Sequence, residues 1–316
     1  MAAKRHKRRK KEVVRKNTIE KQSERIIVFI FAPFATFCGY SAASLSRDKM
    51  PRMAVKKPPL TIQVTTLWDY PSQHYGDDVQ GDPNYRGATP SYIIWNLLQR
   101  YTQEKDLVID PCCGSGTTLD VARDLNRKAL GYDVAPSRKD IFRVDARKLP
   151  QELTDKVDFV FIDPPYSTHV EYSDDPRCIG KLDAGIDGGK AYYDAMEEVI
   201  AEIHRVLKPG KHMALYVSDS FVKGKPFMPI GFELFAIMRK YLEPVDVVAV
   251  IRHNKTLDMG NYRRAAEEGN FFLRGFNYLF IMRKGSEVNP PAKSAQTVNK
   301  ATQQRKPFQN QRGNRR

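Results

Sequence analysis

The sequence predicts an α/β protein built on a doubly wound, largely parallel sheet. Between residues 57 and 283, short apolar runs typical of buried strands alternate with segments whose apolar residues recur at helical spacing. Several of the runs end at or next to an aspartate, where the chain is expected to turn. Strands that alternate with helices pair in parallel, because each helix carries the chain back to the same end of the sheet.

The first half of this region predicts three short strands. Residues 107–110 form an apolar run, and the loop Pro-Cys-Cys-Gly-Ser-Gly-Thr-Thr leads from it into a helix through Leu119 and Leu125. Residues 129–133 predict the next strand, and a third is expected just before Asp145.

The second half predicts four strands and two helices. The run 157–162 is apolar enough for a buried strand. Residues 192–207 predict the clearest helix, because apolar side chains recur every three or four positions and Lys-Pro-Gly ends it. The remaining elements are, in order, a strand at 212–217, a helix at 232–241, a strand at 245–251 and a closing strand at 276–284.

Positive charge is concentrated at the two ends of the 316-residue chain. The formal net charge is +15; residues 1–56 carry 15 basic against 4 acidic side chains, and residues 284–316 carry 8 against 1, which leaves the centre at −3. Both ends have little to bury in a core, so we expect them to be disordered and to hold a polyanion or, alternatively, to keep the protein soluble. The expected organisation is an N-terminal extension over 1–56, one domain over 57–284 and a basic tail over 285–316.

Residues 26–43 form an apolar stretch behind a basic segment, which is the layout of a signal peptide or a short membrane anchor. Pro33 in its middle and the small polar residues in its second half weaken that interpretation. Met50 and Met53 follow at once, so the alternative is that the natural start lies there. A membrane partner is expected only if residues 26–43 are a real anchor.

The four cysteines, at positions 38, 112, 113 and 178, form neither a Cys-x-x-Cys pair nor a cluster with histidine at metal-ligand spacing. Four cysteines in a chain of this length do not make a disulfide framework either. We therefore expect reduced thiols, a cytoplasmic location and no metal.

A glycine loop and three acids predict a nucleoside site. Gly114 and Gly116 lie between a strand and a helix, where glycine permits a tight turn and the close approach of a ligand. The loop lacks the lysine of a P-loop and the third glycine of a dinucleotide fingerprint. Asp110, Asp133 and Asp145 follow three successive strands, and Asp133 could accept both hydroxyls of a ribose. Three carboxylates suit a nucleoside that carries a cation, such as S-adenosylmethionine, although each acid alone is also a common turn former.

The tetrapeptide Asp163-Pro164-Pro165-Tyr166 follows the run 157–162. Proline offers no N–H to a sheet, so the chain must leave the sheet here. Ligands of open α/β sheets bind at this end of the strands, which makes the acid and the ring a candidate site. The alternative is a Pro-Pro turn with a surface tyrosine.

These residues resemble two motifs of the adenine-N6 and cytosine-N4 DNA methyltransferases. "DPCCGSGTT" is similar to the cofactor loop "DPFCGSGTT" of that family, with Cys112 in place of a phenylalanine that packs near the cofactor. "DPPY" is similar to the catalytic tetrapeptide, and "YRGATPSYIIWNLLQRYT" is similar to the segment that leads into the cofactor pocket. The resemblance covers residues 85–284 and implies a seven-stranded Rossmann-like methyltransferase sheet with an antiparallel last strand.

The resemblance also implies S-adenosylmethionine as cofactor and a nucleic-acid base as substrate. Asp163 and a carbonyl at Pro164 would accept the two hydrogens of a base amine, and Tyr166 would stack on the base after it is flipped out of a duplex. The expected catalytic residues are Asp163, Pro164, Pro165 and Tyr166, and the expected cofactor-binding residues are Thr89, Pro90, Asp110, Cys112, Gly114, Ser115, Gly116, Thr117, Asp133 and Asp145.

Two polar segments, residues 167–190 and 252–274, combine basic and aromatic side chains in a way that suits nucleic-acid contact. Ordinary solvated loops are the alternative for both. Each segment is too short for the independent target-recognition domain of many sequence-specific members. The expected nucleic-acid-binding residues are His169, Tyr172, Arg177, Arg252, Lys255, Tyr262, Arg263, Arg264 and Arg274.

The predicted function is that of a site-specific DNA methyltransferase of the restriction-modification kind. Adenine N6 is preferred over cytosine N4, because the "DPPY" form leans toward adenine within the family. A DNA substrate would place the protein at the nucleoid. The first alternative is an RNA base methyltransferase acting on ribosomal or transfer RNA, which the basic ends permit. A second alternative is a nucleic-acid-binding protein that keeps the fold without catalysis, although the presence of both Asp163 and Tyr166 argues against it.

Overall fold

A computed structural model describes most of the central region of the chain. The predicted N-terminal extension, including the apolar stretch 26–43, lies outside the described residues, and so does the tail from residue 287 onward. Within the described part, no helix has both the length and the apolar character needed to cross a membrane. The described residues are 59–85, 87–221, 226–253 and 257–286.

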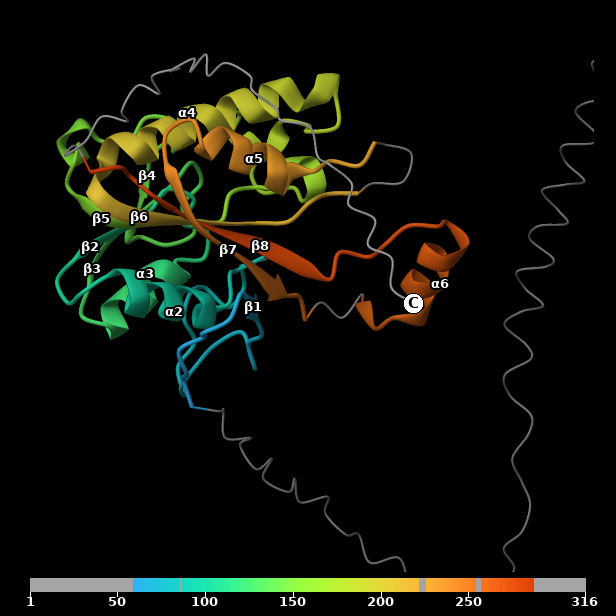
Figure 1. Cartoon of the computed structure of the whole chain (residues 1–316), viewed down its shortest axis with the longest axis horizontal. Helices are drawn as coiled ribbons and strands as arrows, with labels where there is room; N and C mark the ends of the chain where they lie inside the picture. The colour runs from blue at the N-terminus through green and yellow to red at the C-terminus, as the bar shows by residue number, and fades with distance from the viewer. Residues whose placement is uncertain (1–58, 86, 222–225, 254–256, 287–316) are drawn as a thin grey trace, which may run out of the picture. The chain divides into compact units, whose positions relative to one another are not determined.

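One eight-stranded sheet lies at the centre of the described region, in the order β1-β7-β8-β6-β5-β2-β3-β4 (Figure 1). β8 runs antiparallel to both of its neighbours, and the other neighbouring strands pair in parallel. The predicted α/β fold with an antiparallel last strand is confirmed, and β1 is a two-residue addition that the sequence did not predict. The strands are β1 (Leu67–Trp68), β2 (Leu107–Asp110), β3 (Lys128–Asp133), β4 (Ile141–Arg143), β5 (Val157–Ile162), β6 (Leu207–Val217), β7 (Glu243–Ile251) and β8 (Phe276–Arg283).

Helices cover both faces of the sheet (Figure 1). α4 (Lys190–Val206) and α5 (Ile230–Met238) pack on one face, and α2 (Ser91–Tyr101) and α3 (Thr117–Asp124) lie on the other. α4 covers the predicted range 192–207 to within two residues, because its apolar side chains face the core along its whole length.

The central strand β5 shows why the sheet needs both layers. All six of its residues are buried. Val160 and Ile162 join the core beneath α4 and α5, whereas Phe159 and Phe161 join the core beneath α2. Successive side chains of a strand point to opposite faces, so an unbroken apolar run is what a strand covered on both sides requires.

The pairing of β2 with β5 fixes where the site lies. From β2 the chain continues to β3 and β4 on one side, and from β5 it continues to β6 on the other. The two strands pair in parallel, with Ile109 opposite Val160. Asp110, the last residue of β2, and Asp163, directly after β5, therefore leave the sheet at the same edge, at the point where the winding reverses and where such sheets bind ligands.

The segment between β7 and β8, described over residues 252–253 and 257–275 and called the arm below, extends beyond the ends of these strands. It carries helix α6 (Gly260–Glu268) (Figure 1). The N–H of Arg252 donates to the carbonyl of Gly275 at 3.0 Å, which closes the base of the arm. α6 buries none of its residues, and the ring of Phe272 is 84% exposed. The arm therefore contributes little to the core of the domain.

Replacing Phe159 by alanine is expected to lower the free energy of unfolding by about 3–5 kcal/mol, because a fully buried ring leaves a cavity at the centre of the sheet. Chemical denaturation monitored by circular dichroism measures the loss. Phe272→Ala is the matched control and should change stability by about 0.5 kcal/mol or less. Equal losses in the two variants would contradict the described burial.

Candidate active site

Two neighbouring cavities open at the carboxyl ends of the central strands. The inner cavity, about 250 Å³, is lined by the loop after β2, by the end of β3 and by the tetrapeptide after β5. Every predicted catalytic residue lines it, and so do eight of the ten predicted cofactor residues. The two exceptions are Pro90, which lines the neighbouring cavity, and Gly116.

The outer cavity, about 440 Å³, lies on the side of β6, β7 and β8 and is more open to solvent. Thr89, Asp163 and Tyr166 line both cavities, so they form part of the boundary between them. The outer cavity is also lined by Tyr70, His74, Tyr216, Arg252, His253 and Asn277.

The Asp163 carboxylate accepts one hydroxyl hydrogen bond on each oxygen. Thr89 Oγ1 donates to Oδ2 at 2.5 Å, and the Tyr166 hydroxyl donates to Oδ1 at 2.6 Å. Burial raises the pKa of Asp163 to about 6, although the two hydroxyls favour the charged form and act in the opposite direction. Asp163 is therefore ionised at neutral pH and is surrounded by neutral donors.

The backbone of the tetrapeptide is held from the side of α4 and of the following loop. The Tyr192 hydroxyl donates to the carbonyl of Pro165 at 2.8 Å, and the N–H of Tyr166 donates to the Tyr172 hydroxyl at 3.2 Å. Two prolines in succession restrict the chain further. The direction of the Asp163 side chain is thus fixed before any ligand binds.

Asp110 is the most deeply buried acid of the site, with 3% of its surface exposed. The Thr118 hydroxyl donates to its Oδ2 at 2.5 Å, and the N–H of Cys112 donates to its Oδ1 at 3.1 Å. Burial raises the pKa of Asp110 to about 7, against the effect of these two hydrogen bonds. Asp110 therefore shapes the loop after β2 in addition to lining the inner cavity.

Asp133 ends β3, as predicted, and its two oxygens bind different loops. Oδ2 accepts the N–H of Gly114 at 3.0 Å, and Oδ1 accepts the N–H of Ala135 at 2.9 Å. Each oxygen keeps a further lone pair for a hydroxyl of a ligand. Asp145 differs, because Arg147 binds both of its oxygens, at 3.0 and 2.7 Å, and holds its pKa below the usual range although burial acts in the opposite direction.

Left-handed backbone explains both glycines of the loop. Gly114 has φ +46° and Gly116 has φ +81°. A Cβ on Gly114 would lie 3.0 Å from the ring of Tyr85, and one on Gly116 would lie 2.6 Å from Nη1 of Arg138. The glycines therefore admit protein groups as well as any ligand, and Tyr85 is part of the cavity wall.

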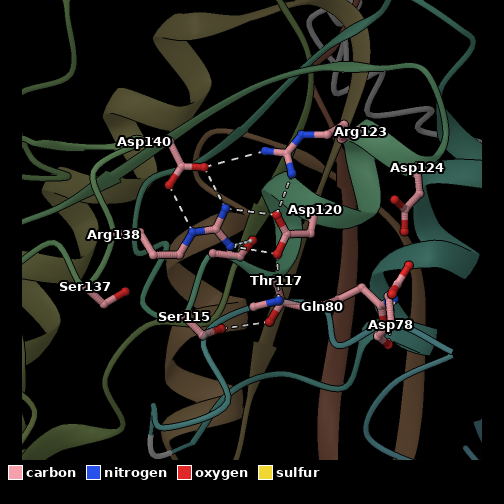
Figure 2. Close-up of polar contacts among 12 residues, drawn as sticks. Asp78, Gln80, Ser115, Thr117, Asp120, Arg123, Asp124, Ser137, Arg138 and Asp140 are labelled. Carbon is pink, nitrogen blue, oxygen red and sulfur yellow. Dashed lines mark hydrogen bonds and ion pairs between the residues drawn. The ribbon is translucent and has the colours of Figure 1, made fainter. Parts of the chain in front are cut away.

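An ion network supports the glycine loop from outside (Figure 2). Arg138 donates to both oxygens of Asp120, at 2.7 and 2.9 Å, and to both oxygens of Asp140, at 3.0 and 2.6 Å. Asp120 also accepts the N–H of Gly81 at 2.7 Å. The network ties the start of α3 to the segment before α2 and to the turn after β3.

The cysteine thiols of the site are not activated. Cys112 and Cys178 line the inner cavity, and burial raises the pKa of both above the ordinary value for a thiol. Such thiols are weak nucleophiles at neutral pH. Cys112 instead packs against the core beneath α4, at the position where the resemblance predicted a phenylalanine near the cofactor.

The predicted nucleic-acid residues divide into two groups. Tyr172, Arg177 and Arg252 line the inner cavity, and Arg252 also lines the outer one. Tyr262, Arg263, Arg264 and Arg274 lie on the arm, where Tyr262 is exposed and the Arg274 guanidinium lies 5.4 Å from the centre of the Phe227 ring. Arg263 and Arg264 are exposed on α6, Lys255 lies outside the described residues, and so does the side chain of His169.

Several residues of the site were not predicted individually from the sequence. Tyr85 and Tyr216 line the cavities, and Arg138 contacts the glycine loop from outside; these three residues come from separate segments that only the fold brings together. Asn277 is 6% exposed, and its Oδ1 has no hydrogen-bond partner among the described residues. It stands in a strand that the sequence predicted only as part of the core.

The inner cavity fits the expected cofactor. Among the described residues that line it, Arg177 and Arg252 are the two arginines, and Arg177 is paired with Asp175 at 2.8 Å. Carboxylates outnumber them, and Asp133 has lone pairs for a ribose. This lining suits a positively charged nucleoside better than a polyphosphate. The described residues contain no group of three or more potential metal-ligating side chains.

Comparison with known proteins gives one match along most of the chain. A family model described as DNA methylase, N6_N4_Mtase, matches residues 4–143 and 157–316. Among curated proteins, the type II methyltransferase M2.LlaDCHI of Lactococcus lactis subsp. cremoris is 37% identical over 65 residues, which are 21% of this chain and 23% of that protein. M.HindIII of Haemophilus influenzae is 42% identical over 53 residues, 16% of this chain and 17% of that protein.

These matches span less than a quarter of the length of the curated relatives. Among solved structures, that of TrmN from Thermus thermophilus is 17% identical, with a TM-score of 0.41, and the match covers 63% of this chain and 50% of that chain.

Asp120→Ala is expected to lower the free energy of unfolding by about 1–3 kcal/mol, because it removes one of the two acids that bind Arg138 and leaves the N–H of Gly81 without its partner. Burial alone would raise the pKa of Asp120, but Arg138, Gly81 and Arg123 together hold it below the usual value. This contribution is therefore present above pH ~4 and is lost as the pH falls through the lowered pKa of the folded state.

Denaturation of the wild type and of the variant at pH 7 and at pH 3 measures this difference. Asp194→Ala, which breaks the exposed pair with Lys190, is the control and should cost about 0.5 kcal/mol or less. A difference between wild type and Asp120→Ala that stays constant with pH would contradict the assigned ion network.

Proposed function

Because the chain belongs to the N6_N4_Mtase family of DNA methylases, we propose that it transfers a methyl group from S-adenosylmethionine to the exocyclic amine of a base in DNA. Adenine N6 is the proposed acceptor in preference to cytosine N4. The observation that carries the proposal is the position of Asp163, which lines both cavities and directly follows β5, the strand paired with the one that precedes the glycine loop. A group at this boundary can touch a cofactor on one side and a base on the other.

The inner cavity is proposed for the cofactor and the outer cavity for the base. Asp133 would bind the ribose, and the glycine loop would lie against the rest of the nucleoside. When bound, S-adenosylmethionine supplies a methyl group on a positively charged sulfur. The outer cavity offers Tyr70, Tyr166 and Tyr216 as rings against which a flat base could lie.

The proposed chemical task of Asp163 is to make the amine nucleophilic. The lone pair of an exocyclic base amine is delocalised into the ring, so the nitrogen attacks poorly. Accepting one N–H hydrogen at Asp163 and the other at the carbonyl of Pro164 would favour a tetrahedral nitrogen with a localised lone pair. The nitrogen would form the new bond to carbon with that pair while the carbon–sulfur bond breaks and its electrons leave with sulfur as a neutral thioether. The nitrogen would then lose one proton, for which Asp163 is an adjacent acceptor.

Preorganisation supports this assignment. The Tyr192 and Tyr172 contacts hold the two ends of the peptide bond between Pro165 and Tyr166, and Thr89 holds the carboxylate. Fixed acceptors of this kind are worth about 3 kcal/mol of transition-state stabilisation each, because they need no reorganisation during the reaction. A mobile surface turn, the alternative considered for the tetrapeptide, would not have these contacts.

The arm is proposed to bind the nucleic acid. Its base carries Arg252 and His253 at the mouth of the outer cavity, and α6 presents Arg263 and Arg264 to solvent. A base flipped from a duplex would enter the outer cavity while the phosphate backbone of the nucleic acid passes along these arginines. DNA as substrate also places the protein in the cytoplasm, at the nucleoid.

One experiment tests the function directly. The protein is supplied with methyl-labelled S-adenosylmethionine and either unmethylated, PCR-amplified genomic DNA or in vitro transcribed RNA, and the digested nucleosides are identified. Labelled N6-methyladenine in DNA is the expected result. Label found in RNA alone would show that RNA and not DNA is the substrate. Binding of nucleic acid without methyl transfer would favour the non-catalytic alternative.

Asp163→Ala is expected to reduce methyl transfer at least 10²-fold, because the amine loses its charged acceptor, while S-adenosylmethionine binding stays close to that of the wild type. Labelled transfer and calorimetry measure the two quantities. Glu171→Ala, an exposed acid a few residues later in the chain, serves as the control. Near-normal turnover of Asp163→Ala would remove this residue from the reaction.

Asp133→Ala is expected to weaken S-adenosylmethionine binding by about 1–3 kcal/mol, because the ribose hydroxyls lose a charged acceptor. Isothermal titration calorimetry gives the affinity, and thermal unfolding reports any loss from the Gly114 contact. Asp140→Ala removes a neighbouring acid that does not line the inner cavity. Unchanged affinity in a folded Asp133→Ala variant would exclude Asp133 from the cofactor site.

A further inference from the structure

Each oxygen of Asp163 accepts a hydrogen bond from a hydroxyl group, and the two hydroxyl groups belong to side chains with different surroundings. Thr89 is 7% exposed and immediately precedes Pro90, at the start of α2. Its backbone is restricted by the proline that follows. The Tyr166 ring is half-buried and lines both cavities, on the faces that a base and a cofactor would reach.

The two hydroxyls differ in how freely they can move. The Thr89 side chain is short and buried, so its hydroxyl could rotate away from Oδ2 only among packed neighbours. The Tyr166 hydroxyl stands at the end of a long side chain beside open space and can leave Oδ1 by rotation about its side-chain bonds. Each oxygen also keeps a further lone pair, and the position that the more mobile donor can vacate for an incoming N–H is on Oδ1.

We propose that Thr89 is the positioning residue of Asp163, and that the Tyr166 hydroxyl occupies Oδ1 in the free enzyme until the substrate amine displaces it. The inference rests on the proposed function and describes how Asp163 is held before the substrate binds. Thr89 was expected from the resemblance to bind the cofactor. Its hydrogen bond instead joins it to the carboxylate, across 74 residues of sequence.

An exchange of donors explains why the free site is stable. A buried carboxylate oxygen without a donor costs free energy, so the Tyr166 hydroxyl stabilises the site before substrate arrives. Replacing one neutral donor by another leaves the number of hydrogen bonds at the carboxylate unchanged. The displaced ring is then available to stack on the base, which was the role expected for Tyr166 from the sequence.

The exchange has a signature in the pH dependence of the reaction. A hydrogen bond donated to a carboxylate favours the charged form, so loss of a donor raises the pKa of Asp163 above its value of about 6. The acid limb of kcat/KM reports the free enzyme, and that of kcat reports the enzyme with its substrate. A donor that stays on Asp163 after the substrate binds affects the acid limbs of both kcat and kcat/KM. A donor that is on Asp163 only before the substrate binds affects the acid limb of kcat/KM alone.

Other titratable or charged groups around Asp163 are unchanged in the variants proposed below. Asp110, with a pKa of about 7, titrates in the same range and its pKa is raised in part by Asp163, but it remains in each variant, so differences between variants originate at Asp163. The neighbouring groups are Asp110, Cys112, Tyr85, Tyr172, Tyr216 and Arg252.

The test compares Thr89→Val, Thr89→Ser and Tyr166→Phe with the wild type, using labelled S-adenosylmethionine and the DNA or RNA in which the wild type deposits its label. Thr89→Val should move the acid limbs of both kcat and kcat/KM upward by about one pH unit. Thr89→Ser, which keeps the hydroxyl, should leave both acid limbs at their wild-type positions. Tyr166→Phe should move the limb of kcat/KM upward and leave that of kcat in place.

Each outcome decides the inference. Acid limbs that do not move in Thr89→Val would show that the Thr89 hydroxyl does not influence the pKa of the Asp163 carboxylate. A shift of both limbs in Tyr166→Phe would show that the Tyr166 hydroxyl stays on Oδ1 in the complex with substrate. Thermal unfolding checks that Thr89→Val is folded, and Thr89→Ala replaces it if it is not. Absence of transfer by the wild type would instead contradict the proposed function.

Discussion

The structure depends on the parallel pairing of β2 with β5. That single pairing brings Asp110 and Asp163 to the same edge of the sheet although 52 residues separate them in the chain. Because helices cover both faces of the sheet, an acid at this edge is removed from water, and burial raises the pKa of both groups. Each acid is then stabilised by a buried threonine hydroxyl, Thr118 for Asp110 and Thr89 for Asp163. An acid that accepts a threonine hydroxyl hydrogen bond thus lies at the ends of both β2 and β5, the two strands between which the winding of the sheet reverses.

The rest of the site is arranged around these two carboxylates. The glycine loop is held from inside by Asp133 and from outside by the network of Arg138, so its backbone is constrained on both sides. The tetrapeptide is constrained by its prolines and by tyrosines of the following segments. The outer cavity is the more open of the two, and Arg252 and Asn277 line the space proposed for a base. A rigid half for the cofactor and a more open half for a polymer fit the function that we propose.

Much of this could be predicted from the sequence because its strongest signals are local. The run before Pro164 predicted β5 to the residue, and Asp133 was predicted at the end of β3, where it lies. The two-residue strand β1 was missed because so short a strand leaves no periodicity, and its pairing is made by the distant β7. The Thr89 contact was missed for a related reason. A hydrogen bond between residues 74 positions apart depends on the packing of α2 against the sheet, which no spacing in the sequence encodes. Asp145 was predicted beside the cofactor, and its neighbour Arg147 was overlooked although it stands only two residues away.

The exposed helix of the arm has an evolutionary consequence. Because α6 buries no side chain and the arm is closed at its base by a backbone hydrogen bond, substitutions along it are nearly invisible to selection for folding. This segment could therefore be exchanged or lengthened without loss of the fold. If the arm binds nucleic acid as we propose, such changes would alter the choice of target while the residues around Asp163 stay the same.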